Sequence, residues 1–344
     1  GILFGPIAFI LIPLGCIFAG GVHDYFAGML SIKNSGAQIT GLIHKYLGKN
    51  AFKIFMIIVS IMLLLLATVF VYTAGDLFAE RFMGVKDFVI TDSKVLWTYI
   101  IILLYFVMAT LFPIDKIIGK FYPILGLMLI IGTGFVLIGF LINGVSLQNL
   151  NLTNFNIHPN HLPLIPMFFM TVSCGLLSGF HSTQATIISR TVDKEQDGRR
   201  IFYGAMITEG VVALVWATVS IFFFYNGGWR EVCPPEVVTH FLSQFEGGKS
   251  LIQFFGAPEV VKFACEGWLG AVGGILAILG VVAAPITSGD TAFRSARLII
   301  ADFLHLEQKQ VLKRLTISVP LFFIATLLLV WQILSFHSVP PGLF

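Results

Sequence analysis

Long apolar runs alternate with short polar connections along the whole chain of 344 residues. A run of about 20 apolar residues is the length that an α-helix needs to cross the hydrocarbon core of a bilayer. Such stretches lie at residues 1–21, 54–74, 95–112, 121–142, 164–189, 201–225, 269–287 and 315–334. Their continuity argues against a β-barrel, whose strands would show short alternating segments. The pattern predicts an all-α, polytopic membrane protein with about eight transmembrane helices, in which residues 1–344 form a single transmembrane domain.

Composition supports this class and excludes others. Hydrophobic residues make up 57% of the chain and charged residues 11%, and the mean hydropathy is +0.91. These values exclude a water-soluble globular protein. The formal net charge of +3 is too small and too scattered to form a basic face for nucleic acid. The lipid bilayer is therefore the predicted environment, and no nucleic-acid partner is expected.

The distribution of Lys and Arg predicts the orientation, because cytoplasmic connections retain cations. Fifteen of the 21 Lys and Arg residues lie in the first, third, fifth and seventh connections. We therefore predict that these connections are cytoplasmic and that both ends of the chain face outside. Within the first connection, residues 36–48 have the pattern of a short amphipathic helix on the cytoplasmic surface. The long outer loop at 226–268 contains Cys233 and Cys265. On the outer side of the membrane these two cysteines can form a disulfide, and two free thiols are the equal alternative.

One carboxylate lies deep within a predicted span. Glu209 is about eight residues, or roughly 12 Å, into the sixth span, which places it near mid-membrane. Ala205, Ala213 and Ala217 follow at helical spacing and predict a small-residue stripe that faces the bundle with Glu209. A buried carboxylate there suits proton coupling, although a structural hydrogen bond between helices is the alternative.

The fifth span contains small and polar residues that favour a broken helix near residues 173–184. Transporters use such breaks to bind substrate through backbone groups at the midplane. A kinked but continuous helix is the alternative. His181 in this segment is a candidate for proton coupling. The candidates for substrate binding are Ser173, Gly175, Ser178, Gly179, Ser182, Thr183 and Gln184.

Two further acids lie near the ends of spans. Pro285 and Gly289 predict an interruption of the seventh span, where Asp290 would cap the restarted helix or pair with Arg294 at i,i+4. Asp24, next to His23, ends the first span. Asp24 and Asp290 complete the candidates for proton coupling, together with Glu209 and His181.

Motifs of common enzyme chemistries are absent from the sequence. The chain has no HExxH, P-loop or CxxC pattern, so it predicts no metal site and no cofactor. Ser178 and His181 form a weak pattern for an intramembrane serine protease. We therefore expect a protein that is not an enzyme, with the protease and a channel as less favoured alternatives.

Four blocks of sequence together resemble the carbon starvation protein A (CstA) family. They are residues 20–31 (GGVHDYFAGMLS), residues 173–182 (SCGLLSGFHS), the helix around Glu209 and residues 284–298 (APITSGDTAFRSARL). The resemblance runs over essentially the whole chain. It implies an inner-membrane carrier with a LeuT-like inverted-repeat bundle, in which the first span would be the second core helix and the fifth span the broken sixth. Family members also have helices that would precede and follow the matching region. We therefore expect this chain to be a fragment of a longer carrier.

The residues and the resemblance together predict a secondary active transporter that takes up small peptides or small carboxylates during carbon starvation. Protons are the expected coupling ion, and alternating access of one repeat against the other is the expected mechanism. A pyruvate-specific proton symporter is the main alternative.

Overall fold

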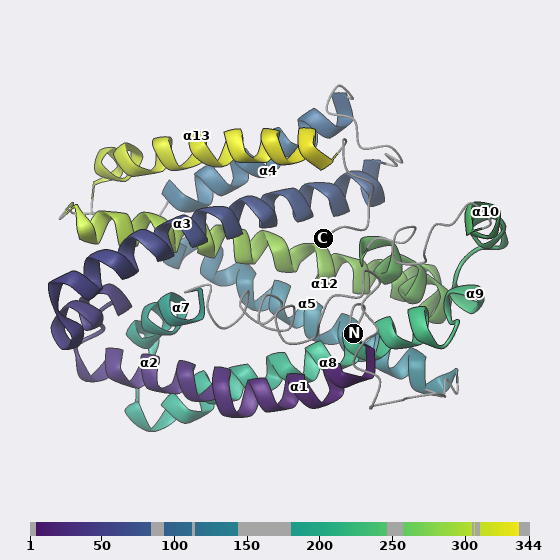
Figure 1. The fold of residues 1–344 in the computed structure, drawn as a ribbon, viewed down its shortest axis with the longest axis horizontal. Helices are drawn as coiled ribbons and strands as arrows, with labels where there is room; N and C mark the ends of the chain where they lie inside the picture. Colours follow the sequence, from purple (N-terminus) through teal and green to yellow (C-terminus); the bar gives the residue numbers. More distant parts are fainter. Residues whose placement is uncertain are drawn as a thin grey trace.

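The computed structural model describes residues 5–83, 93–111, 114–143, 180–245, 257–304, 306 and 310–336, and every regular element within these ranges is helical (Figure 1). The N-terminal rod consists of η1 (Gly5–Ile7), α1 (Ala8–Leu14), the π-helical turn η2 (Gly15–Gly20) and α2 (Gly21–Lys33). The other long helices are α3 (Ile39–Met83), α4 (Ser93–Leu111), α5 (Ile114–Ile142), α8 (Gly204–Tyr225), α12 (Ala257–Phe303) and α13 (Val311–Phe336).

Shorter elements connect the long helices. Helix α7 (Phe180–Ile188) is followed by the turns η3 (Ser189–Thr191) and η4 (Glu195–Asp197) and by the π-helical turn η5 (Arg199–Tyr203), which leads into α8. Helices α9 (Trp229–Val232) and α10 (Pro235–Phe245) follow α8. The all-helical prediction is confirmed.

Six helical segments within the described residues are long and apolar enough to cross a membrane. They are Gly5–Lys33, Ile39–Asp76, Ser93–Thr110, Pro123–Ile142, Glu195–Tyr225 and Val311–Leu334. Each overlaps one of the predicted spans. The predicted fifth span ends in α7, while its residues 164–179 lie outside the described part. The predicted seventh span lies within α12, which is bent at Gly270, where φ is 63°.

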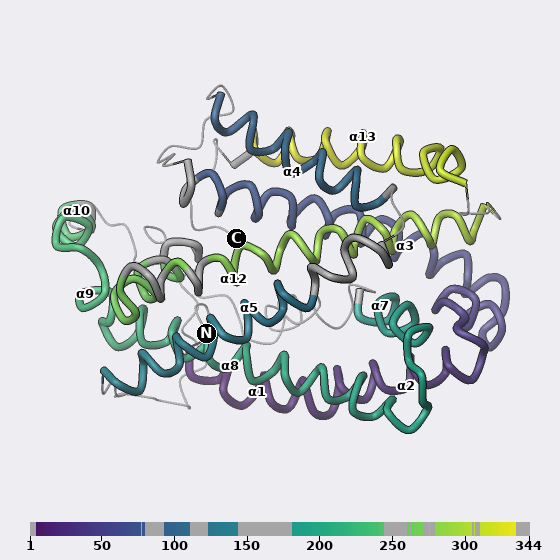
Figure 2. Tube along the Cα trace, turned by 180° about the vertical axis from the view of Figure 1, so that it is seen from behind, coloured from purple at the N-terminus to yellow at the C-terminus, as the bar shows by residue number. Residues whose placement is uncertain are grey.

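Two groups of helices have separate packing clusters. The first cluster joins α3, α4, α12 and α13 through buried side chains such as Leu63, Phe106, Phe293 and Phe322. The second joins α2, α7 and η5 through Ala27, Ala185 and Phe202. We call these the α3–α12 group and the α2–α7 group. Seen from behind, α5 runs between α12 and α8 and completes the bundle (Figure 2).

Glycines let the N-terminal rod approach α8 closely (Figure 1). An ideal Cβ on Gly28 would lie 2.5 Å from the ring of Phe202, and one on Gly210 would lie 2.9 Å from Cys16 Sγ. Tyr203 also donates a hydrogen bond to the Ile17 carbonyl at 3.2 Å. The two π-helical turns, η2 and η5, therefore lie in this interface, in keeping with the frequent use of such turns near functional sites.

The predicted interruption at Pro285 and Gly289 is wrong. Helix α12 continues through both residues, and its one non-helical position in the described part is Gly270. Gly289 serves close packing instead, because an ideal Cβ there would lie 2.7 Å from Phe106 Cζ. The Thr287 hydroxyl donates to the carbonyls of Ala283 and Ala284, so it is satisfied within the same helix.

The elements after α8 enclose a buried aromatic cluster. Trp229 packs edge-on against Phe241 with ring centroids 4.8 Å apart. Cys233 and Cys265 are both buried in this part of the protein, and the structure has no disulfide bond between them.

Candidate functional site

The side chain of Asp24 connects two histidines on two helices. Its Oδ1 accepts a hydrogen bond from His23 Nδ1 at 2.9 Å, and its Oδ2 lies 3.2 Å from His181 Nδ1 on α7. The side chain of Asp24 is 13% exposed, that of His181 19% and that of His23 36%. A partly buried carboxylate between two imidazoles can hold or release a proton when water reaches it. We call His23, Asp24 and His181 the Asp24 cluster.

A polar network fixes α7 against α2 beside this cluster. The Ser31 hydroxyl donates to the Ala37 carbonyl at 2.7 Å and lies 2.7 Å from Ser189 Oγ. Ser189 donates in turn to the Thr186 carbonyl at 2.8 Å. Sequence reasoning missed this network, because Ser31 lies 155 residues before Thr186 and 158 before Ser189, and no local pattern relates them. It holds His181 in register with Asp24.

Glu209 lies on α8 with an exposed side chain, so the prediction that it faces the bundle is wrong. Ala205 is exposed as well, whereas Ala217 is buried. The reason is that the glycine contact at Gly210, and not the alanine stripe, selects the face of α8 that packs against the rod. Glu209 nevertheless interacts electrostatically with His181, which places its charge near the Asp24 cluster.

The predicted substrate-binding residues divide into two sets. Ser182 and Thr183 are buried in α7, and Gln184 is half-buried. The other four, Ser173, Gly175, Ser178 and Gly179, lie outside the described residues. The broken-helix prediction lies there too, except for the part within α7.

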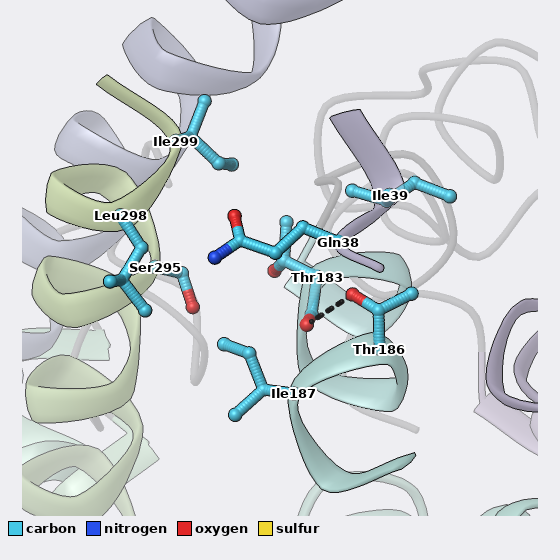
Figure 3. A pocket seen from close by; sticks show the side chains of 8 residues that line it. All are labelled: Gln38, Ile39, Thr183, Thr186, Ile187, Ser295, Leu298 and Ile299. Carbon is cyan, nitrogen blue, oxygen red and sulfur yellow. Dashed lines mark hydrogen bonds between the residues drawn. The ribbon is translucent and has the colours of Figure 1, made fainter. Parts of the chain in front are cut away.

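Thr183 lines a small cavity between the two helix groups (Figure 3). Gln38 before α3 and Ser295 on α12 complete its polar lining, and Thr186 donates to the Thr183 carbonyl at 3.0 Å beside it. The cavity measures about 10 Å³, which is room for about one water molecule and not for a peptide. This conformation therefore leaves the two groups in near contact at this point.

Asp290 lies in the other helix group. Its Oδ2 accepts a hydrogen bond from Arg294 Nη2 at 2.6 Å, as the i,i+4 spacing predicts. The Asp290 side chain is fully buried and that of Arg294 is 12% exposed. The neighbouring Gly289 packs on Phe106 of α4. Asp290 therefore lies in the α3–α12 group, whereas Asp24 and His181 lie in the α2–α7 group.

The helices, their apolarity and the buried polar groups between them define a multi-pass α-helical membrane protein. A profile of the family described as carbon starvation protein CstA matches residues 3–91 and 71–244. The chain belongs to the CstA family.

The relatives differ widely in how much of the chain they match. An uncharacterized membrane protein of Haemophilus influenzae is 37% identical over 271 residues, which are 66% of this chain and 72% of the relative. The peptide transporter CstA of Helicobacter pylori is 37% identical over 22% of this chain and 11% of its own length. The pyruvate/proton symporter BtsT of Escherichia coli is 46% identical over 15% of this chain and 7% of its own length. No solved structure matches.

Proposed function

We propose that this protein is a proton-coupled secondary transporter of small peptides or small carboxylates, with the Asp24 cluster and Glu209 as its proton-handling groups. The observation that carries the proposal is the contact of Asp24 with His181 across two helices, near the charge of Glu209. The peptide transporter and the pyruvate/proton symporter among the relatives support this class of substrate and ion.

The two packing groups supply a means of alternating access. The Asp24 cluster belongs to the α2–α7 group, which its own hydrogen bonds hold together. The α3–α12 group has a separate core. A movement between two internally rigid groups exposes the residues at their boundary to one side and then to the other.

Proton binding and substrate binding would be coupled through charge. A proton on His181 strengthens its hydrogen bond to Asp24, because hydrogen bonds between ionised groups are stronger than neutral ones. Loss of that proton weakens the contact between α2 and α7. A carboxylate substrate near this cluster would compete with Asp24 and Glu209 for the same cation.

Uptake into proteoliposomes tests the proposal. The purified protein that carries this chain is given labelled dipeptide or labelled pyruvate, with and without an imposed proton gradient. We expect gradient-driven uptake of one of them. Glu209→Gln and Asp24→Asn should lose driven uptake and keep substrate counterflow, because exchange moves no net proton.

Matched controls come from the exposed connection between α7 and α8. Glu195→Gln and Asp193→Asn make the same chemical changes on exposed side chains and should leave driven uptake intact. Driven uptake at the unmodified rate in both Glu209→Gln and Asp24→Asn would refute the assignment of these residues. Uptake of pyruvate without dipeptide would select the pyruvate-specific alternative.

A further inference from the structure

The first part of α3 forms an elbow at one end of the bundle. Residues 39–47 form a short helical segment, and Gly48 then turns the chain at φ 86° and ψ 177° into the long apolar part of the helix. That backbone conformation is essentially restricted to glycine. We call residues 39–53 the elbow. The sequence pattern predicts that it lies on the cytoplasmic surface of the membrane.

The elbow carries a surplus of positive charge, because three lysines lie in it and the acid that contacts it is Asp302 of α12. Lys45, Lys49 and Lys53 are exposed, and Lys33 at the end of α2 is exposed as well. Between Asp24 and the next acid of the sequence, Asp76, there is no Asp or Glu. The Lys45 ammonium donates to Asn34 Oδ1 at 2.6 Å, which is a neutral acceptor and leaves the charge in place.

Exposed apolar side chains lie beside these lysines. Tyr46 is 57% exposed, Leu47 70% and Ile54 62%. They flank the turn at Gly48, where the candidate membrane segment Ile39–Asp76 enters its most apolar part. Apolar side chains next to lysines at this depth match the boundary between acyl chains and headgroups of a bilayer.

The elbow also connects the two helix groups. On its buried side, Thr40 donates to Asp302 Oδ2 of α12 at 2.7 Å, and Phe52 lies 6.1 Å from the ring of Phe303. Asn34 holds it to the α2–α7 group, where Arg190 donates to the Gly36 carbonyl at 2.8 Å. The elbow is therefore a covalent link between the groups, and it has contacts to both.

We propose that the elbow is a binding site for the phosphate headgroups of anionic phospholipids, held by Lys45, Lys49 and Lys53, with Tyr46 and Leu47 placed among the acyl chains. Charge complementarity identifies the occupant, because anionic lipids attract basic segments that lie at the membrane surface. Because of its contacts to both groups, a lipid bound here would influence the position of one group relative to the other. The lipid site itself does not depend on the proposed transport activity.

Lipid preference in nanodiscs tests the site. The purified protein is placed in bilayers that contain spin-labelled phosphatidylglycerol or spin-labelled phosphatidylcholine, and the motionally restricted fraction of each label is measured. We expect a preference for phosphatidylglycerol. The triple variant K45Q/K49Q/K53Q should reduce it by about tenfold, since each lysine near the surface contributes about twofold after screening by salt.

Two further variants separate the site from general effects. The triple variant K194Q/R199Q/R200Q removes the same charge from exposed residues of the α7–α8 connection, which lies at the same end of the bundle as the elbow (Figure 1). It should keep the preference, and K45R/K49R/K53R should keep it too and show that the elbow still folds.

An equal loss in K45Q/K49Q/K53Q and K194Q/R199Q/R200Q would overturn the proposal, as would an unchanged preference in the elbow variant. Displacement of labelled phosphatidylglycerol by inorganic phosphate would also overturn it, because the site would then hold a soluble anion. Failure of uptake in the proteoliposome assay would leave this measurement unaffected.

Discussion

Gly28→Ala tests the close contact that positions α2 against the segment leading into α8. An ideal Cβ at Gly28 would lie 2.5 Å from Phe202 Cε2 and Cζ, whereas ordinary carbon contacts are about 3.5–4.0 Å. Phe202 is 4% exposed and packs in the core of the α2–α7 group, so its ring has little room to move. The added methyl group must therefore separate the two segments or distort the ring.

The expected cost follows from two opposing effects. Overpacking of a tight core costs about 1–3 kcal/mol. Replacing glycine by alanine inside a helix stabilises it by up to about 1 kcal/mol. Gly204→Ala is the matched control, because an ideal Cβ there has nothing within 4 Å and the residue is helical. The free energy of unfolding of Gly28→Ala should lie about 1–3 kcal/mol below that of Gly204→Ala, since the helical effect cancels in this comparison.

The assay measures stability in detergent micelles: each variant is heated, and the fraction of protein that stays monodisperse is determined. Phe202→Leu alone should destabilise the protein. In the double variant with Gly28→Ala it should restore much of the stability that Gly28→Ala loses, because the smaller side chain leaves room for the methyl group. Equal stability of Gly28→Ala and Gly204→Ala would refute the close contact. Additive effects of Gly28→Ala and Phe202→Leu would refute their coupling.

Two further predictions concern buried groups of α12. Asp290→Asn should destabilise the protein by roughly 3–5 kcal/mol, because Arg294 would keep a buried charge without its carboxylate. The double variant Asp290→Asn with Arg294→Gln should recover part of the lost stability in the same heating assay. Full stability of Asp290→Asn alone would contradict this. Burial, with a smaller contribution from Glu266, raises the pKa of Cys265 to about 12, so its thiol should not react with a maleimide at about pH 7 or about pH 9 until the protein is denatured. Rapid labelling of the native protein at Cys265 would contradict the burial.

Much of the fold could be predicted because the membrane imposes it. Any helix that crosses a bilayer must be long and apolar, so the length of each run indicates its structure without knowledge of its neighbours. The Asp290–Arg294 pair was predictable for a similar reason, since spacing along one helix brings two side chains together. The continuity of α12 through Pro285 was not predictable in this way, because a long helix with packed neighbours tolerates a proline that would end an isolated helix.

Contacts between distant segments could not be predicted from local pattern. Asp24 and His181 are 157 residues apart, and no periodicity relates them. The exposed position of Glu209 has the same origin, because its orientation depends on which face of α8 the N-terminal rod contacts. A small-residue stripe indicates close packing in membranes, but here single glycines on both helices decide the interface.

Burial separates the two acidic sites and ranks them for proton handling. Asp290 is fully buried and is paired with an arginine that stays charged, so a proton cannot reach it from water without movement of α12. Asp24 is 13% exposed, and its partner His23 is 36% exposed, so Asp24 is less completely enclosed by protein than Asp290. Both partners of Asp24 are imidazoles, which serve as proton donors and acceptors in proteins, whereas the partner of Asp290 is a guanidinium that keeps its proton. We therefore expect substitutions at Asp24 to alter the pH dependence of uptake, and those at Asp290 to lower the amount of folded protein while leaving the pH dependence of the remainder unchanged.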